Sequence, residues 1–306
     1  MTPSTDSENA GRYLVRVTRD VCFGTGLVEA LDKSGLAIER KLLLDVYTPV
    51  AAANGTRQPA LVLAFGGAFH RGSKEDDSYE NDRWQNTSIA EYCCRFASHG
   101  YVCFSVGYRL TQERPDPGPV RWITAPDQIS RSRMDHVREL LGLPPATVAE
   151  LTDGMEAAFQ DVAGAFNFVH GNAADYGVDP ARIAIGGFSA GGTSALYAAF
   201  AGGVPAAAVI ALSGRMEAPD IAQYITEERT IPVLQCVGQY DLEYVRSLTL
   251  RMRDRFADLG IRQVLQHVPG AGHFYPRNAK VEDCDGKTST VEDAIASFLS
   301  STIGVP

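Results

Sequence analysis

The residue in this sequence best suited to nucleophilic chemistry is Ser189, within the run Gly187-Phe188-Ser189-Ala190-Gly191-Gly192. The apolar residues 183–185 precede this run, and a helix-like stretch, residues 193–200, follows it. Glycines on both sides permit a strand-to-helix turn so tight that it exposes the serine hydroxyl beside the next backbone N–H. This geometry predicts attack on an acyl group. The alternative is a glycine turn that holds a serine by chance, because the chain has 29 glycines.

Two further residues complete the chemistry that an attacking serine requires. Asp241 follows the apolar stretch 231–237, and His273 follows the stretch 263–268 in the run Pro269-Gly270-Ala271-Gly272-His273. A serine hydroxyl attacks when a base removes its proton, and neutral histidine suits that role near neutral pH. A carboxylate on the other ring nitrogen orients the histidine and stabilises the imidazolium ion. We therefore predict Ser189 as nucleophile, His273 as base and Asp241 as the orienting acid, in the chain order expected for a nucleophile elbow.

Each of these assignments has a plainer alternative. Asp241 is also placed to cap the helix that follows it, and Glu243 is then the fallback acid. His273 is one of six histidines, but the others do not stand at a comparable strand-to-loop exit with flanking glycines. These five are His70, His99, His136, His170 and His267.

A glycine-rich loop, residues 65–73, follows the apolar stretch 60–65. Backbone N–H groups in such a loop can stabilise the oxyanion formed during acyl transfer, at about 3 kcal/mol per donor. The plainer interpretation is an ordinary turn. The side chains next to the predicted catalytic residues are candidate substrate contacts, namely Phe65, His70, Arg71, Phe188 and Tyr240.

Strand and helix patterns alternate along most of the chain, which predicts an α/β protein with a mostly parallel sheet and helices on both faces. Eight strands are expected, at residues 13–17, 37–47, 60–65, 101–106, 182–187, 207–212, 231–237 and 263–268. Helices are expected at residues 86–98, 155–169, 190–200, 242–259 and 291–299. Residues 1–11 are predicted to form a flexible tail, and residues 12–306 a single domain with an insertion at about 110–150.

The composition narrows the class of protein. A net charge of −9 without a basic stripe argues against a nucleic-acid partner. No apolar run reaches transmembrane length, and residues 1–11 lack a signal-peptide pattern. The six cysteines show no zinc-ligand spacing, so we expect reduced thiols, a cytoplasmic location, no metal and no cofactor. Whether the chain forms a homo-oligomer stays open.

Three segments resemble the α/β-hydrolase superfamily, and within it the carboxylesterase and hormone-sensitive-lipase-like esterases. The segment 65–73 is similar to their oxyanion loop, Tyr108-Arg109-Leu110 to the motif after their next strand, and residues 176–192 to their nucleophile segment. The resemblance implies an α/β-hydrolase fold, oxyanion donors at the N–H groups of Gly67, Ala68 and Ala190, and a lid formed by the insertion.

Two features depart from that family pattern. Phe65 stands where the loop has histidine, and Ala68 where it has its last glycine. Because the donors are backbone groups, both changes are compatible with an oxyanion hole. The interval from Ser189 to Asp241 is short for the hormone-sensitive-lipase-like esterases. It is closer to that of feruloyl esterases, acetyl esterases and aryl formamidases.

The sequence therefore predicts a serine esterase that acts on a small-molecule ester through an acyl-enzyme intermediate. The alternatives are an amide hydrolase on the same residues, such as an aryl formamidase or aminoacyl peptidase, and a non-catalytic ligand-binding member of the fold.

Two charged groups are expected to be solvated. For the run Glu75-Asp76-Asp77, the alternative is contact with a cationic substrate. For Arg131, Arg133 and Arg138, the alternative is binding of a substrate carboxylate.

Overall fold

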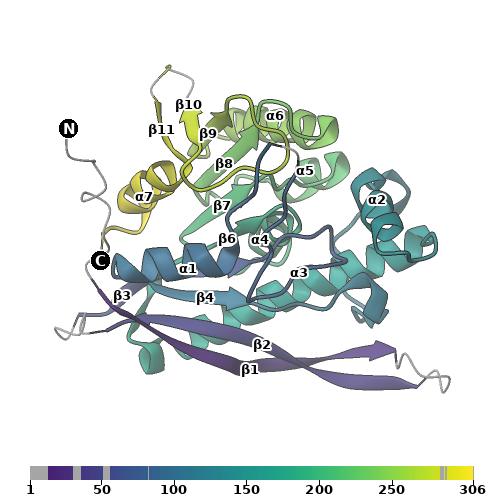
Figure 1. The fold of residues 1–306 in the computed structure, drawn as a ribbon, viewed down its shortest axis with the longest axis horizontal. Helices are drawn as coiled ribbons and strands as arrows, with labels where there is room; N and C mark the ends of the chain where they lie inside the picture. The colour runs from purple at the N-terminus through teal and green to yellow at the C-terminus, as the bar shows by residue number, and fades with distance from the viewer. Residues whose placement is uncertain are drawn as a thin grey trace.

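The computed structural model describes residues 13–29, 36–50, 56–81, 83–282, 286 and 288–305. The predicted tail, residues 1–11, lies outside the described residues. The described chain folds around one twisted sheet, with helices packed on both of its faces (Figure 1). The predicted α/β architecture is therefore confirmed.

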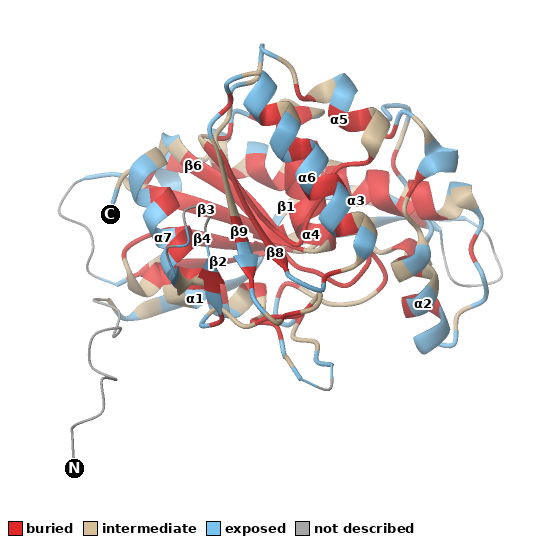
Figure 2. Cartoon of the chain, turned by 90° about the horizontal axis from the view of Figure 1, so that it is seen from above, coloured by how far each residue is buried: buried red, intermediate tan, exposed pale blue. Residues whose placement is uncertain are grey.

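Six parallel strands form the centre of the sheet, in the order β4-β3-β6-β7-β8-β9. β3, β4, β7, β8 and the second half of β6 are almost entirely buried, as their continuous apolar sequences predict, whereas β9 is only partly buried. Figure 2 shows the buried residues of these strands in red between the two layers of helices. Their bounds are Val102–Val106 for β4, Gln58–Ala64 for β3, Val178–Phe188 for β6, Ala208–Leu212 for β7, Val233–Gly238 for β8 and Gln263–Val268 for β9.

Antiparallel strands extend both edges of this parallel centre. On one side β2 (Ala37–Pro49) pairs with β4, β1 (Val15–Glu29) with β2, and the short β5 (Pro115–Asp116) with β1. On the other side β10 (Lys280–Glu282) pairs with β9, and β11 (Thr288–Thr290) with β10. The described residues thus form an eleven-stranded mixed sheet in place of the predicted mostly parallel eight-stranded one. The three additional strands have two or three residues each, too few to leave a periodic pattern.

The helices cover the two faces in two groups (Figures 1 and 2). α1 (Ile89–Ser98) and α7 (Val291–Thr302) lie on one face. α3 (Val148–Gly171), α4 (Ala190–Phe200), α5 (Ala218–Tyr224) and α6 (Glu243–Asp258) lie on the other. Side-chain caps fix where three helices begin, because Ser88, Thr147 and Thr290 each accept a hydrogen bond from a backbone N–H of the first turn.

The segment 110–150 contains two short 3₁₀ turns, strand β5, helix α2 (Ser132–Leu140) and the first residues of α3. α2 carries Arg133 and Arg138, and Arg138 is buried, so the expectation that this arginine is solvated was wrong. Among the helices that the structure describes, none combines the length and apolar character needed to cross a bilayer. Because the six central strands are parallel, their carboxyl ends meet at one edge of the sheet, and the predicted catalytic residues lie in the loops at that edge.

Candidate active site

Ser189 lies in a strained turn between β6 and α4. Its backbone has φ 51° and ψ −111°, a conformation that residues with a side chain rarely adopt. The Ser189 N–H donates to Leu212 O at 2.7 Å, which fixes the turn to the neighbouring strand. A Cβ on Gly187 or Gly191 would overlap the carbonyl oxygen of Ala64 at the end of β3. The glycines therefore allow this elbow to pack directly on the start of the glycine-rich loop.

The three predicted catalytic side chains form a continuous hydrogen-bonded chain. Ser189 Oγ lies 2.8 Å from His273 Nε2, and His273 Nδ1 lies 2.6 Å from Asp241 Oδ1. Both contacts are satisfied when the His273 ring is protonated on Nδ1. This N–H donates a hydrogen bond to Asp241, and Nε2 accepts a hydrogen bond from the Ser189 hydroxyl. The loops that carry the acid and the histidine are joined, because Tyr240 N–H donates to Ala271 O at 2.8 Å.

The Asp241 carboxylate is buried and hydrogen-bonded on both oxygens. Ser213 Oγ donates to Oδ2 at 2.6 Å, and Leu242 N–H donates to Oδ1 at 2.7 Å. The Tyr275 hydroxyl lies 3.0 Å from Ser213 Oγ and supports it. Leu242, not Asp241, is the N-cap of α6, and the fallback acid Glu243 is exposed. The geometry thus favours Asp241 as the partner of His273.

The glycine-rich loop has an unusual backbone with free donors. Gly67, Ala68 and Phe69 have φ values of 134°, 56° and 61°. In the part of the chain that the structure describes, no group accepts a hydrogen bond from the N–H of Gly67, Ala68 or Ala190. All three residues are buried, and a buried N–H without an acceptor is rare and costly. Such donors are available to an oxygen that acquires negative charge.

Asp77 anchors this loop, although the sequence predicts the whole run Glu75-Asp76-Asp77 to be solvated. Its side chain is only 1% exposed. Oδ2 accepts from Gly66 N–H and Oδ1 from Ile89 N–H, each at 2.7 Å. Burial raises the pKa of Asp77 to about 7. The prediction was wrong for this residue, which ties the start of the loop to the first turn of α1.

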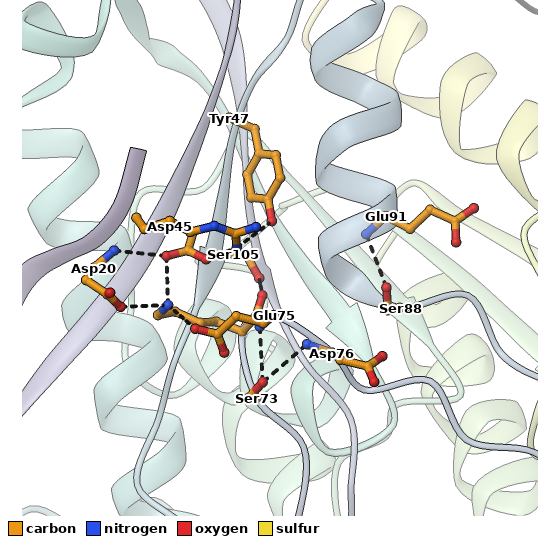
Figure 3. Close-up of polar contacts among 11 residues, drawn as sticks. Asp20, Asp45, Tyr47, Ser73, Glu75, Asp76, Ser88, Glu91 and Ser105 are labelled. Carbon is orange, nitrogen blue, oxygen red and sulfur yellow. Dashed lines mark hydrogen bonds and ion pairs between the residues drawn. The ribbon is translucent and has the colours of Figure 1, made fainter. Parts of the chain in front are cut away.

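Lys74 fixes the other end of the loop. Its ammonium group donates to Asp45 at 2.7 Å, to Asp20 at 2.9 Å and to Glu75. Figure 3 shows the carboxylates of Asp20, Asp45 and Glu75 converging on one point. Burial alone would lower the pKa of Lys74, but these hydrogen bonds raise it.

These three carboxylates are also spaced closely enough to hold a metal ion. The ammonium group of Lys74 already supplies the positive charge at their centre. We therefore interpret the cluster as an anchor for the loop, and not as a metal centre.

The five candidate substrate contacts occupy different environments. Phe65 is buried and stacks on Tyr108, with ring centroids 4.0 Å apart. Phe188 is buried with its ring centroid 5.5 Å from that of His273. Tyr240 is 66% exposed.

His70 and Arg71 lie at the end of the oxyanion loop. His70 is completely buried, with Nδ1 2.7 Å from Ala68 O and Nε2 3.1 Å from Arg138 Nη1. Burial, with the charge of Arg138, lowers the pKa of His70, which favours the neutral ring. The Arg71 guanidinium stacks on Tyr79 at 4.0 Å.

Sequence reasoning missed Ser213, Asp77 and Lys74 as supports of the site. No pattern marks Ser213, which reaches Asp241 only because strands β7 and β8 are neighbours. For Asp77 and Lys74, a signal was available in their position directly after the glycine-rich loop.

Comparison with known proteins agrees with this geometry. Residues 147–280 match the phospholipase/carboxylesterase family model. That segment includes Ser189 and its elbow, Asp241 and His273. Among curated proteins, none is similar enough in sequence to match.

Solved structures share the fold at low sequence identity. Thermogutta terrifontis esterase 2, phosphoramylated by tabun, is 17% identical with a TM-score of 0.54, covering 98% of this chain and 95% of that one. A putative dienelactone hydrolase from Klebsiella pneumoniae is 15% identical with a TM-score of 0.55, covering 94% and 98%. An α/β-hydrolase enzyme from a Medee basin deep-sea metagenome library is 14% identical with a TM-score of 0.51, covering 86% and 84%.

These matches show that the chain has the α/β-hydrolase fold. The resemblance to esterases of this superfamily, predicted from the motifs, is confirmed. The match of residues 147–280 to the phospholipase/carboxylesterase family model supports the prediction of an ester hydrolase.

Proposed function

We propose that this chain, an α/β-hydrolase by fold, hydrolyses a small-molecule carboxylic ester through an acyl-serine intermediate. Ser189 attacks the carbonyl carbon, His273 takes the serine proton and Asp241 orients the imidazole. The observation that carries the proposal is the pair of contacts at His273, 2.8 Å to Ser189 Oγ and 2.6 Å to Asp241 Oδ1. These distances lie within the reach needed for proton transfer in the ground state.

In the first half of the reaction, the proton moves from Ser189 Oγ to His273 Nε2 as the oxygen attacks. The imidazolium ion then donates that proton to the departing alcohol, and the acyl group stays on the serine. Water attacks the acyl-enzyme in the second half, with the same histidine as base. The hydrogen bond from Ser213 helps to keep the Asp241 carboxylate directed at Nδ1.

We assign the oxyanion hole to the N–H groups of Gly67, Ala68 and Ala190. Their burial without acceptors among the described residues supports this assignment. A developing oxyanion there would satisfy donors that cost free energy while they are unpaired. Anchoring of the loop by Asp77 and Lys74 keeps the donors in place before the substrate binds.

We further propose that the segment 110–150 acts as a lid over the acyl site. Its helix α2 reaches the site twice, through Arg138 at His70 and through Arg133 at Phe274. The five described cysteines are free, which supports a reducing, cytoplasmic compartment.

The test is the substitution Ser189→Ala, assayed with a p-nitrophenyl ester. The expected result is a loss of kcat by a factor of at least ~10³ with an unchanged circular dichroism spectrum. Ser247→Ala, at an exposed site on α6, is the matched control and should keep the activity. Activity that persists in the Ser189 variant would overturn the assignment.

The amide alternative is tested by the p-nitroanilide of the same acid. We expect a kcat/KM for the ester well above that for the anilide, and the reverse order would make the chain an amide hydrolase. Wild-type protein inert toward both compounds would favour the non-catalytic alternative.

A further inference from the structure

Two arginines near the predicted catalytic residues have no counter-ion among the residues that the structure describes. Among the described arginines that are not exposed, only Arg71 and Arg133 have a guanidinium with neither an ion pair nor a hydrogen bond. Nε of Arg71 is itself buried and unpartnered. A partly buried cation in this state costs free energy, and an anion that binds to it recovers that cost.

The two arginines belong to one continuous stack of side chains. The Arg71 guanidinium lies 4.0 Å from the centroid of the Tyr79 ring, and that ring is 6.1 Å from the ring of Phe274. The Arg133 guanidinium lies 5.4 Å from the centroid of Phe274. Contact with an aromatic face leaves the N–H groups at the edge of a guanidinium free to bind a carboxylate.

This stack lies directly beside the catalytic residues. Phe274 follows His273, and their ring centroids are 5.5 Å apart. At the other end, the Arg71 carbonyl fills the space that a Cβ on Gly67 would need. The Tyr79 hydroxyl, which is buried and unpartnered, also lies against the loop at Gly67. An anion held here would be close to the predicted oxyanion hole.

Neighbouring arginines differ from these two in one clear respect. Arg131, the N-cap residue of the helix that carries Arg133, pairs with Asp135 at 2.7 Å. Burial and the positive charge of Arg71 lower the pKa of Arg133, and the Asp241 carboxylate offsets this effect only in part. In a chain with a net charge of −9, two partly buried arginines without an ion pair among the described residues are a local exception.

We propose that the substrate carries a carboxylate group, which Arg71 and Arg133 bind next to the scissile ester. This inference rests on the proposed esterase function and names its substrate class. The carboxylate belongs either to the acyl part or to the alcohol part of the ester, and the substrates below distinguish the two.

Two matched pairs of esters test the proposal. For the acyl side, the p-nitrophenyl monoester of adipate is compared with p-nitrophenyl hexanoate, which has the same number of acyl carbons without the charge. For the alcohol side, p-acetoxybenzoate is compared with its methyl ester. The measured quantity is the ratio of kcat/KM for the anionic ester to kcat/KM for the neutral ester.

Arg71→Met and Arg133→Met should each lower this ratio about tenfold or more for one of the two pairs, which is about 1.4 kcal/mol of transition-state binding. Arg131→Met, at the N-cap of the same helix, is the control, and it should leave the ratio unchanged because Arg131 is paired with Asp135. In the wild type, added KCl should lower the ratio because salt screens the attraction.

The inference is overturned if both variants keep ratios within twofold of the wild type for both pairs of esters. In that case, Ser189-dependent hydrolysis of the neutral esters would still leave the esterase proposal intact. Absence of Ser189-dependent hydrolysis of every ester would overturn both proposals. Since Arg71 lies within the oxyanion loop, its substitution can also impair folding. The Arg133 variant, on a separate helix, then decides the outcome.

Discussion

Substitution of Asp77 by asparagine tests whether the oxyanion loop depends on a buried carboxylate. Each carboxylate oxygen accepts one backbone N–H at 2.7 Å, from Gly66 in the loop and from Ile89 in α1. An asparagine amide has one oxygen only. Its NH₂ group would therefore face one of these N–H donors, and a hydrogen bond would be replaced by a repulsive contact between two donors.

The expected size of the effect follows from burial. Asp77 is 1% exposed, so water cannot replace the lost acceptor. A buried unsatisfied group costs about 1–3 kcal/mol. If the whole cost raises the activation free energy by displacing the loop, kcat decreases by between about fivefold and about a hundredfold.

The assay is kcat for a p-nitrophenyl ester at about pH 8.5, where a carboxyl group with a pKa of about 7 is ionised. Asp76→Asn is the control, because Asp76 is the exposed neighbour and its carboxylate bonds only to Ser78 in the described chain. A variant with a lower Tm but wild-type kcat at temperatures well below it would refute the reasoning. Asp77 would then support the fold alone.

Three further results are expected. Lys74→Met should lower the unfolding free energy in urea by about 3 kcal/mol, because it removes a cation from the fully buried Asp45 carboxylate; a loss below about 1 kcal/mol, typical of an exposed pair, would contradict this. Ser213→Ala should lower kcat about tenfold with little change in KM, because Asp241 Oδ2 loses its donor; stopped-flow or steady-state kinetics with an unchanged kcat would contradict it. Burial raises the pKa of Asp77 from 3.8 to about 7, so its contribution to the unfolding free energy should be lost as the pH rises from about 4 to about 7. The difference in unfolding free energy between the wild type and Asp77→Asn should accordingly be larger at about pH 5 than at about pH 7.5, and a constant difference would count against that pKa.

The sequence predicted the centre of the fold well because its strands are buried on both faces. Continuous apolar runs such as residues 60–65 and 101–106 are typical of strands that are covered on both faces of a parallel sheet. The prediction was poorest for β1, of which only the beginning was expected. Its register shifts between Thr18 and Val21 and again between Cys22 and Gly24, and these irregularities break the alternation that reveals an edge strand.

The catalytic candidates were visible in the sequence because each follows a strand that ends at the same edge of the sheet. Their supports were not, since they depend on contacts between distant segments. Asp77 belongs to an acidic run that is typical of a solvated loop, and only the approach of α1 buries it. Similarly, nothing in the sequence distinguishes Arg133, which lacks a counter-ion, from Arg131, which has one on the same helix.

The central claim is that Ser189 is activated by His273 and Asp241. The most direct measurement is the site of modification by an organophosphonate probe, mapped by mass spectrometry of the digested protein. We predict one phosphonyl group per chain, on the peptide that contains Ser189, formed in parallel with the loss of esterase activity. A label on another residue, or ester hydrolysis that continues in fully labelled protein, would contradict the account.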